Sequence, residues 1–433
     1  MKRYRKQIVV LLAILSVSSL VFADERPDTL LTVRDVVIEG NLTTKDFVIL
    51  REMKLKPGEK LTAENIEHDQ KRIYSLQLFN KVELDVKPMG AEAVVIVRVD
   101  ERWYLFPFPI LGFRYRNLDN LYYGAGVVHS NFRGRNEKLF FSFALGFDRW
   151  VSLNYQNPRL TDGEDLFLGI QASYSRIRSL SVETDYYYQT NGKLGISLGT
   201  RFGLYQYLLG WVNYDIWQVT EPREGRTVSS DGRDAYLTAG ASYAYDTRDL
   251  REYPTDGTYF TVFANKYGFG ESEVNLVRYG FDLRAHTLLT EDFSVGGRIF
   301  TNQAGGGIIP IYRKAYFGYD DRIRGYFNTV LEGENIFGSS AELRIPLLSP
   351  RNYTLPFEFI PQFSVLRYGL YLGVFADAGK IWYRDQNFSR QRWYAGYGAG
   401  LHFLLPYSLI IRTEYALNNE GRGEFVLDVG TSF

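Results

Sequence analysis

From residue 103 to residue 433, apolar and polar residues alternate through one short segment after another, and this pattern constrains the fold more than any other feature. The last segment shows it clearly, with Phe425, Leu427, Val429, Thr431 and Phe433 on one face and Glu424, Asp428, Gly430 and Ser432 on the other. Successive side chains of a β-strand point to opposite faces of its sheet. A period of two therefore predicts strands, and no long helical period interrupts them.

About sixteen strands are expected in this region, at 108–116, 122–131, 137–147, 150–157, 165–177, 184–202, 205–219, 234–246, 257–266, 274–289, 292–303, 335–346, 368–377, 392–404, 407–418 and 424–433. Residues 179–188 could add a further strand. An even number is favoured, because it returns the chain to the side where the barrel began, as in single-chain bacterial barrels. The pattern predicts a transmembrane antiparallel β-barrel over residues 103–433.

A soluble β-sandwich would show the same alternation, but other features favour the membrane barrel. The mean hydropathy of the chain is slightly negative, which excludes a bundle of apolar helices and agrees with a barrel whose lumen-facing residues are polar. Residues 1–23 read as a secretory signal peptide, with Lys2 and Arg3 at a basic end, an apolar stretch from Ile8 to Leu20, and small-residue cleavage after Ala23. The alternative for this segment is an uncleaved membrane anchor, for which the apolar stretch is short.

Residues 31–102 have the pattern of a small α/β domain. A strand through Val33, Val36 and Ile38 precedes two helices, for which Thr44 and Thr62 are the expected N-caps. Two alternating strands then follow on either side of a turn at 89–90. The expected order is strand, helix, helix, strand, strand.

The longest gap between predicted strands runs from about residue 304 to residue 334, and inserted loops of this length are usually functional. It contains Ile323, Arg324, Gly325 and Tyr326. Downstream, the parity of Glu342 and Asp377 on their strands predicts that both carboxylates point into the lumen. A guanidinium binds a carboxylate best when both are shielded from water. We therefore expect the loop to fold back inside the barrel, with Arg324 locked onto Asp377 and Glu342 close by.

The same residues carry a family resemblance. The segments 323–326 (Ile-Arg-Gly-Tyr), 341–346 (Ala-Glu-Leu-Arg-Ile-Pro) and 375–382 (Phe-Ala-Asp-Ala-Gly-Lys-Ile-Trp) resemble the bacterial surface-antigen superfamily of BamA/TamA/FhaC-like outer-membrane barrels with POTRA domains. Residues 31–102, with Glu39-Gly40-Asn41 and the closing Val99-Asp100-Glu101, resemble one POTRA domain. In the family, the loop arginine meets an aspartate on the strand after next, which implies the same pairing for Arg324.

The resemblance implies a bacterial outer-membrane protein with its POTRA domain in the periplasm, which inserts or translocates polypeptides without hydrolysing nucleotides. The implied partners are outer-membrane lipid and unfolded client polypeptides, and it leaves open periplasmic or lipoprotein accessory factors. The implied mechanism uses the seam between the first and last strands, marked by Gly112, Tyr115, Val429 and Phe433. A short first strand would pair only part of the last one, and the free edge would template a client strand or let the seam open.

One departure from the family limits what can be carried over. Central insertases of this family have several POTRA domains and two-partner secretion translocases usually have two, whereas this chain has room for one. The expected role is therefore dedicated or accessory. The alternative is a transport-inactive pore or a structural surface barrel of the same fold. The terminal aromatic residue also resembles the signal by which barrels are recognised for assembly.

Composition excludes several other classes of function. The chain has no Cys, which removes disulfides and thiol catalysis, and its formal net charge of zero gives no indication of nucleic-acid binding. Its four His lie on unrelated segments without metal-ligand spacing, and no Gly-x-Ser-x-Gly elbow or Walker loop is present. We expect no enzymatic activity, no cofactor and no metal.

Overall fold

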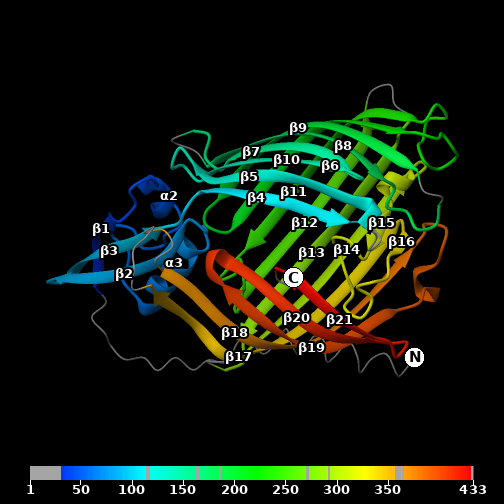
Figure 1. The fold of residues 1–433 in the computed structure, drawn as a ribbon. Coiled ribbons are helices and arrows are strands. Elements are labelled where there is room, and N and C mark those ends of the chain that lie inside the picture. Colours follow the sequence, from blue (N-terminus) through cyan, green and yellow to red (C-terminus); the bar gives the residue numbers. More distant parts are fainter. Residues whose placement is uncertain are drawn as a thin grey trace.

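A small N-terminal domain and a large barrel meet end to end in this protein (Figure 1). The structure is a computed structural model and describes residues 31–433 except 114–117, 162–164, 185–186, 270–272, 291–292, 356–361, 363–364 and 431–432. The signal peptide expected at residues 1–23 lies outside the described residues. None of the described helices combines the length and the apolarity that a membrane crossing requires.

The N-terminal domain is a three-stranded sheet with two helices. Its elements are β1 (Thr32–Glu39), α2 (Asp46–Leu50), α3 (Ala63–Tyr74), β2 (Phe79–Met89) and β3 (Glu92–Glu101). β3 lies in the centre, parallel to β1 and antiparallel to β2. The order of elements is the one expected from the sequence.

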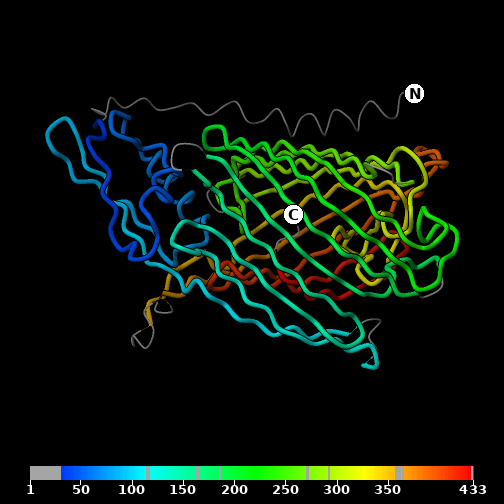
Figure 2. Tube along the Cα trace, turned by 90° about the horizontal axis from the view of Figure 1, so that it is seen from above, coloured from blue at the N-terminus to red at the C-terminus, as the bar shows by residue number. Residues whose placement is uncertain are grey.

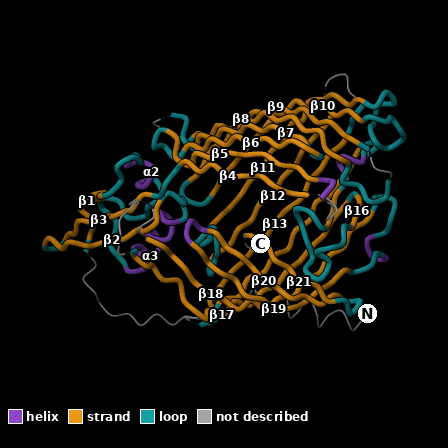
Figure 3. The backbone as a smooth tube through the Cα atoms, viewed as in Figure 1, coloured by secondary structure: helices purple, strands orange, loops and turns teal. Residues whose placement is uncertain are grey.

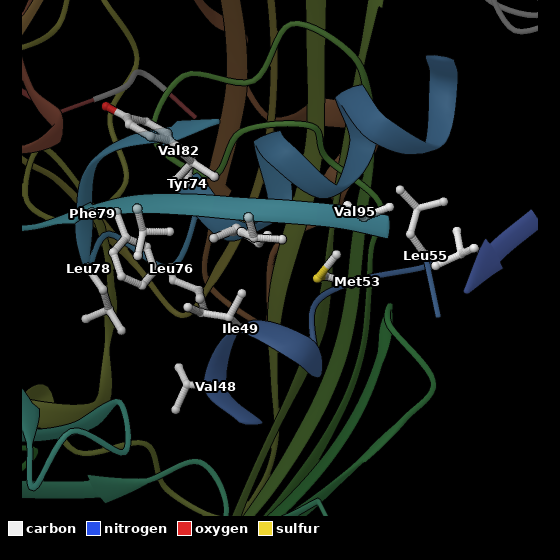
Figure 4. Close-up of a cluster of buried hydrophobic side chains, with 14 residues drawn as sticks. Val48, Ile49, Met53, Leu55, Tyr74, Leu76, Leu78, Phe79, Val82 and Val95 are labelled. Atoms are coloured by element: carbon white, nitrogen blue, oxygen red, sulfur yellow. The ribbon is translucent and has the colours of Figure 1, made fainter. Parts of the chain in front are cut away.

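Apolar side chains from the helices fill one face of this sheet. Ile49 of α2, Ile73 of α3 and Val95 of β3 are each fully buried, and Met53 and Leu55 of the intervening segment join the same cluster (Figure 4). Burial of one such side chain stabilises a fold by about 1.5–3 kcal/mol. This core holds α3 in a fixed position on the sheet, and α3 in turn contacts the barrel.

Only one of the two expected helix caps is present. The side chain of Thr62 accepts a hydrogen bond of 3.1 Å from the backbone N–H of Asn65, as an N-cap should. The expectation for Thr44 is wrong, because α2 begins two residues later and has Lys45 at its N-cap. The Thr44 hydroxyl instead accepts from Asn131 of the barrel at 2.9 Å. A tertiary contact has replaced the local cap.

The barrel is a single antiparallel sheet of 16 strands, as predicted. The strands are β4 (Leu105–Phe113), β5 (Leu121–Phe132), β6 (Glu137–Gly146), β7 (Arg149–Asn157), β8 (Leu166–Arg178), β9 (Tyr188–Phe202), β10 (Gln206–Val219), β11 (Arg233–Asp246), β12 (Gly257–Phe269), β13 (Leu276–Leu288), β14 (Ser294–Gly306), β17 (Asn335–Thr354), β18 (Val365–Trp382), β19 (Tyr394–Leu405), β20 (Leu409–Asn418) and β21 (Gly423–Val429). Each pairs with its neighbours in chain order, except that β14 pairs with β17 across an inserted loop. In Figure 3 helix is confined to the N-terminal domain and to short turns in the connections of the barrel.

Side chains alternate across the barrel wall as the period of two requires. On β9, Leu194, Ile196 and Leu198 are 61%, 49% and 51% exposed and point outward. The residues between them face the lumen, where Gly195 lies against Asn213 of β10. An apolar outer face and a polar inner face are typical of barrels in a lipid bilayer.

The connections at the two ends of the barrel differ. We call those next to the N-terminal domain the near turns and those at the opposite end the far loops (Figure 2). The connection expected at 346–367 is mostly strand, because β17 continues to Thr354 and β18 begins at Val365. Among its described residues, 179–188 contains no strand except the first residue of β9. These corrections leave the predicted strand count unchanged.

The N-terminal domain docks on the near turns that follow β5, β7, β9, β11, β17 and β19. The contacts include Lys45 N to Gly134 O, Arg51 to Asp165, Glu52 to Arg201, Ser75 to Asp249, Asn80 to Gln362 and Arg102 to Ser408. Phe47 of α2 also packs beneath the guanidinium of Arg159, whose carbon lies 4.8 Å from the ring centroid. The domain therefore lies across the near end of the barrel.

Candidate functional site

The loop between β14 and β17 packs against the barrel wall at the far end. It carries a short hairpin of β15 (Ala315–Phe317) and β16 (Leu331–Gly333). Phe317, Ile323 and Tyr326 are 1%, 2% and 4% exposed and belong to one apolar cluster with Phe300 of β14 and Ile381 of β18. This cluster packs the loop against β14 and β18.

Arg324 lies at the centre of this site. Its Nε and Nη2 donate to the two carboxylate oxygens of Asp377, each at 2.8 Å, and its backbone N–H donates to the same carboxylate at 3.0 Å. Its Nη1 donates to Glu342 at 2.5 Å. The guanidinium carbon also lies 3.7 Å from the ring centroid of Phe375. The contacts expected for Arg324 with Asp377 and Glu342 are both present.

Two glycines let the tip of the loop approach the wall closely. Gly325 has φ +94°, a conformation that other residues rarely adopt. A Cβ on Gly396 of β19 would lie 1.8 Å from the carbonyl oxygen of Arg324. Asn418 of β20 donates to the carbonyl of Gly325 at 3.0 Å, and Tyr326 donates to Asn419 at 2.5 Å. The lock therefore depends on small residues on both sides of the contact.

A third carboxylate, Glu414 of β20, was not identified from the sequence. Its Oε1 accepts from Arg324 at 3.3 Å and from Arg412 at 3.0 Å. Glu414 has the same parity on β20 as Arg412, but only the register of β18, β19 and β20 brings it to Arg324. Arg344 of β17 completes the set by donating to Glu342 at 2.7 Å.

The charges of this cluster balance, since three arginines (324, 344 and 412) face three carboxylates (342, 377 and 414). Glu342, His402 and Glu414 lie within 4.8 Å of one another, a spacing at which such groups could hold a metal ion. Here both carboxylates already accept hydrogen bonds from arginines. A cation would have to displace these guanidiniums, so the residues fit an ion-pair network better than a metal site.

The same loop also contacts other segments at the far end of the barrel. Glu332 accepts from Ser181 at 2.7 Å and from Lys314 at 2.6 Å, which ties the loop to the connection between β8 and β9. Tyr312 donates to Asp234 of β11 at 2.6 Å. The far loops are thus held together by buried polar contacts.

The two ends of the 16-stranded sheet are β4 and β21. Among the described residues, β4 pairs only with β5 and β21 only with β20. Gly112 lies in β4 and Val429 at the end of β21, whereas Tyr115 lies outside the described residues. β4 and β21 are also shorter than β17 and β18. The expected seam therefore coincides with two unpaired strand edges.

Phe433 departs from its expected position on the apolar outer face of the last strand. It is only 4% exposed, and its ring stacks on that of His286 with centroids 5.7 Å apart. β21 ends at Val429, and Gly430 follows with φ +102°. The strand thus ends before Phe433, so a face assignment extended from β21 does not hold for this residue.

Comparisons with known proteins agree with this architecture. Residues 131–433 match the family model of the Omp85 superfamily domain, and residues 31–102 match a POTRA model, a surface antigen variable number repeat. Two curated relatives are outer membrane protein assembly factors BamA. That of Nitratidesulfovibrio vulgaris is 26% identical over 308 residues, covering 67% of this chain and 37% of that protein. That of Neorickettsia risticii is 24% identical over 431 residues, covering 92% and 54%.

The chain thus spans about half or less of the length of these relatives. Among solved structures, BamA from Haemophilus ducreyi lacking POTRA domains 1–3 matches with a TM-score of 0.56 and 17% identity, covering 93% of this chain and 84% of that chain. CdiB from Escherichia coli matches with a TM-score of 0.53 and 10% identity, covering 99% and 96%. At these identities the likeness shows a shared fold.

Proposed function

The chain belongs to the Omp85 superfamily, whose domain model it matches over residues 131–433, and on this premise we propose that it inserts polypeptides into the outer membrane or translocates them across it. It is an outer-membrane β-barrel with an N-terminal POTRA domain. We place this domain in the periplasm, so that the near turns are periplasmic and the far loops extracellular. Clients would then meet the domain before they reach the barrel.

The observation that carries this proposal is the unpaired seam between β4 and β21 in the described residues. In a bilayer each backbone N–H and C=O needs a partner, because no water is there to supply one. Two free edges therefore favour pairing with a further strand. A client strand that pairs with one of them would satisfy these groups and enter the membrane already hydrogen-bonded.

The POTRA domain supplies a second set of edges. Because β3 is central, β1 and β2 each have a side that β3 does not cover, although the start of β1 is already bonded on that side to residues 58–61. An extended client segment can add to such an edge through main-chain hydrogen bonds, which do not depend on client sequence. We propose that the domain receives client segments in this way, and we leave room for accessory periplasmic factors or lipoproteins.

The Arg324 lock has a supporting role in this proposal. Arg324 joins the inserted loop to β17, β18 and β20 at once. Of these strands, β20 pairs with β21 at the seam, and β18 and β17 follow further along the same wall after β19. The lock keeps the loop in the lumen so that the wall beside the seam retains its shape. No step of this mechanism needs a reacting group, and we propose that the protein is not an enzyme.

A second candidate function is a transport-inactive structural or surface barrel. The observation that favours it is closure, since the far loops are joined by buried contacts and the POTRA domain lies across the near turns. This closure does not suit a permanently open pore. It suits a scaffold as well as it suits a resting insertase, so activity has to decide between them.

The decisive experiment locks the seam. The chain has no Cys, so Phe113→Cys and Val429→Cys introduce the only two thiols, both on the outer face with 50% and 64% exposure. A short bismaleimide then joins β4 to β21. The matched control joins Leu372→Cys on β18 to Leu401→Cys on β19. These two residues lie directly opposite each other, and the two strands are already hydrogen-bonded to each other.

We expect the seam crosslink to abolish client insertion into liposomes and the control crosslink to leave it intact. Full insertion activity with the seam locked would reject the gating role. Planar-bilayer conductance of the same preparations separates the two candidates. Client insertion with little steady conductance supports the insertase or translocase, and absence of any client effect supports the inactive barrel.

A further inference from the structure

The near turn between β11 and β12, residues 247–256, contacts the POTRA domain at one end and the lumen at the other. It is the connection that joins Asp246, at the end of β11, to Gly257, at the start of β12. Tyr253 at its centre is only 2% exposed. A turn at the mouth of a barrel normally faces water. This one instead spans two buried polar interfaces.

The first interface is with α3 and the residue that follows it. The Ser75 hydroxyl donates to the carbonyl of Asp249 and accepts from the backbone N–H of Arg251, both at 3.4 Å. Lys71 forms an ion pair with the Asp249 carboxylate at 3.5 Å. These contacts tie the beginning of the turn to the helix.

The turn is closed on itself by the same aspartate. The carboxylate of Asp249 accepts from the backbone N–H of Thr255 at 2.9 Å, from the Thr255 hydroxyl at 2.7 Å and from the backbone N–H of Asp256 at 3.1 Å. A carboxylate that accepts several hydrogen bonds fixes the backbone around it. If a movement of α3 displaces Asp249, the residues between Asp249 and Thr255 must therefore move with it.

The second interface lies in the lumen. The Tyr253 hydroxyl is 2.9 Å from Nδ1 of His402 on β19. The next residue, Pro254, accepts a hydrogen bond of 2.7 Å from Arg344 of β17 through its carbonyl oxygen. The guanidinium of Arg344 also lies 4.3 Å from the ring centroid of Tyr253. The turn thus supplies part of the environment that positions Arg344 and His402.

From these two residues, two short routes lead to Arg324. Arg344 donates to Glu342, which accepts from Arg324 at 2.5 Å. His402 lies 3.3 Å from Glu414, which accepts from Arg324 at 3.3 Å. The side chains of these five residues are all buried, so their hydrogen bonds are shielded from water and strengthened.

We propose that the turn at 247–256 is a coupling element that ties the docked position of the POTRA domain to closure of the Arg324 lock. When α3 leaves the turn, Asp249 loses its helix contacts, Tyr253 and Pro254 are released, and the carboxylates that hold Arg324 are less firmly placed. Energetic coupling between two sites is reciprocal. Opening of the lock therefore weakens docking of the domain by the same factor.

This inference involves no client and is independent of the proposed transport activity. It is tested in purified protein by the rate at which a buried thiol reacts with a bulky maleimide. Ile323→Cys, at a side chain only 2% exposed beside Arg324, reports opening of the lock. Thr44→Cys, at a position 2% exposed against the barrel residue Asn131, reports undocking of the domain.

Docking of α3 on the turn is weakened by the double variant Lys71→Ala with Ser75→Ala. This variant removes the contacts between the helix and the turn and changes no residue in the lumen. A second variant, Tyr253→Phe, deletes only the hydroxyl that meets His402. The matched control is Lys81→Ala with Glu83→Ala, an exposed ion pair of the same domain on β2. Heat-modifiable migration of the barrel confirms folding of each variant before labelling.

We expect the helix variant and Tyr253→Phe each to raise labelling of Ile323→Cys several-fold, and the control to leave the rate unchanged. We also expect Arg324→Ala to raise labelling of Thr44→Cys by a comparable factor. The proposal is overturned if the helix variant leaves the Ile323→Cys rate at the parent value while Arg324→Ala raises that rate. It is equally overturned if Arg324→Ala leaves Thr44→Cys protected.

Discussion

Arg324 and Asp377, 53 residues apart in the sequence, form a buried bidentate ion pair with two side-chain hydrogen bonds of 2.8 Å. Asp377 also accepts from the backbone N–H of Arg324. The Asp377 carboxylate therefore fixes the loop by binding both the side chain and the backbone of Arg324. A planar guanidinium matches this geometry and a lysine ammonium does not.

Arg324→Ala should strongly destabilise the loop between β14 and β17. It leaves the carboxylates of Asp377, Glu342 and Glu414 facing one another without the guanidinium that they share. Removing one partner of a buried pair costs about 3–5 kcal/mol. We expect a large loss of folded barrel, measured as heat-modifiable protein, and rapid proteolysis within residues 307–334. Arg324→Lys should retain the positive charge but lose the bidentate contact. Its yield of folded barrel should therefore lie between those of the parent protein and Arg324→Ala.

The matched control for that prediction is Arg322→Ala in the same loop. Arg322 is half-exposed and pairs with Asp428 at 3.2 Å near the end of the sheet. Exposed ion pairs contribute about 0–1 kcal/mol. A loss of folding for Arg322→Ala as large as that for Arg324→Ala would show that the loop needs positive charge in general and not the lock.

Docking of the POTRA domain should weaken in acid through Glu52. Burial opposes ionisation of this carboxyl, but Arg201 of the barrel and Arg72 of α3 outweigh it and lower its pKa to about 2. A group whose pKa is depressed in the folded protein stabilises it above the unfolded pKa, here 4.5, and loses that stabilisation as the pH falls toward 2. A depression of this size is worth about 3 kcal/mol, of which undocking removes the share due to Arg201.

This acid sensitivity is measurable with the Thr44→Cys thiol by labelling after brief exposure to pH between 5 and 2. We expect protection to decline across this interval in the parent protein. In Glu52→Gln the decline should be flatter and protection lower at neutral pH, because the carboxylate is already missing. The prediction is wrong if Glu52→Gln and the parent lose protection in parallel.

Gly396→Ala should expel the tip of the loop, since its Cβ would lie 1.8 Å from the carbonyl oxygen of Arg324. Backbone cannot move aside as a flexible side chain can, so we expect the Ile323→Cys thiol to become reactive. Gly297→Ala on β14 is the control, because its Cβ would find only one atom within 4 Å, at 3.7 Å. That substitution should change stability by about 0.5 kcal/mol or less.

The features predicted correctly from sequence are those that depend on local pattern. Alternation sets the strand count, and the two carboxylates singled out by their parity, Glu342 and Asp377, both bind Arg324. Thr62 caps α3 through a contact three residues away. Each of these features depends on residues that are close together in the sequence. A single segment therefore contains the information needed to predict it.

The features that were missed depend on register and on contacts between distant segments. Glu414 reaches Arg324 only because β18, β19 and β20 pair as they do. Thr44 gives up its capping role for Asn131, 87 residues away. Phe433 is buried against His286 instead of lying on the outer face, and Gly430, which follows β21, has φ +102°. No periodic pattern records these choices, since each depends on the assembled wall.

The conformation of Gly430 should control how completely the seam can pair. A residue with a Cβ is strained at φ +102° by about 1–3 kcal/mol, and an extended conformation relieves that strain. Gly430→Ala should therefore favour continuation of β21 along the edge that faces β4 and withdraw Phe433 from His286. We expect the Phe113→Cys and Val429→Cys pair to crosslink faster in Gly430→Ala than in the parent.

Gly421→Ala is the matched control, because Gly421 has φ +78° and equally open surroundings but lies in the turn between β20 and β21. It should carry similar strain without changing the crosslinking rate, and equal rates in all three proteins would contradict a role for Gly430 at the seam.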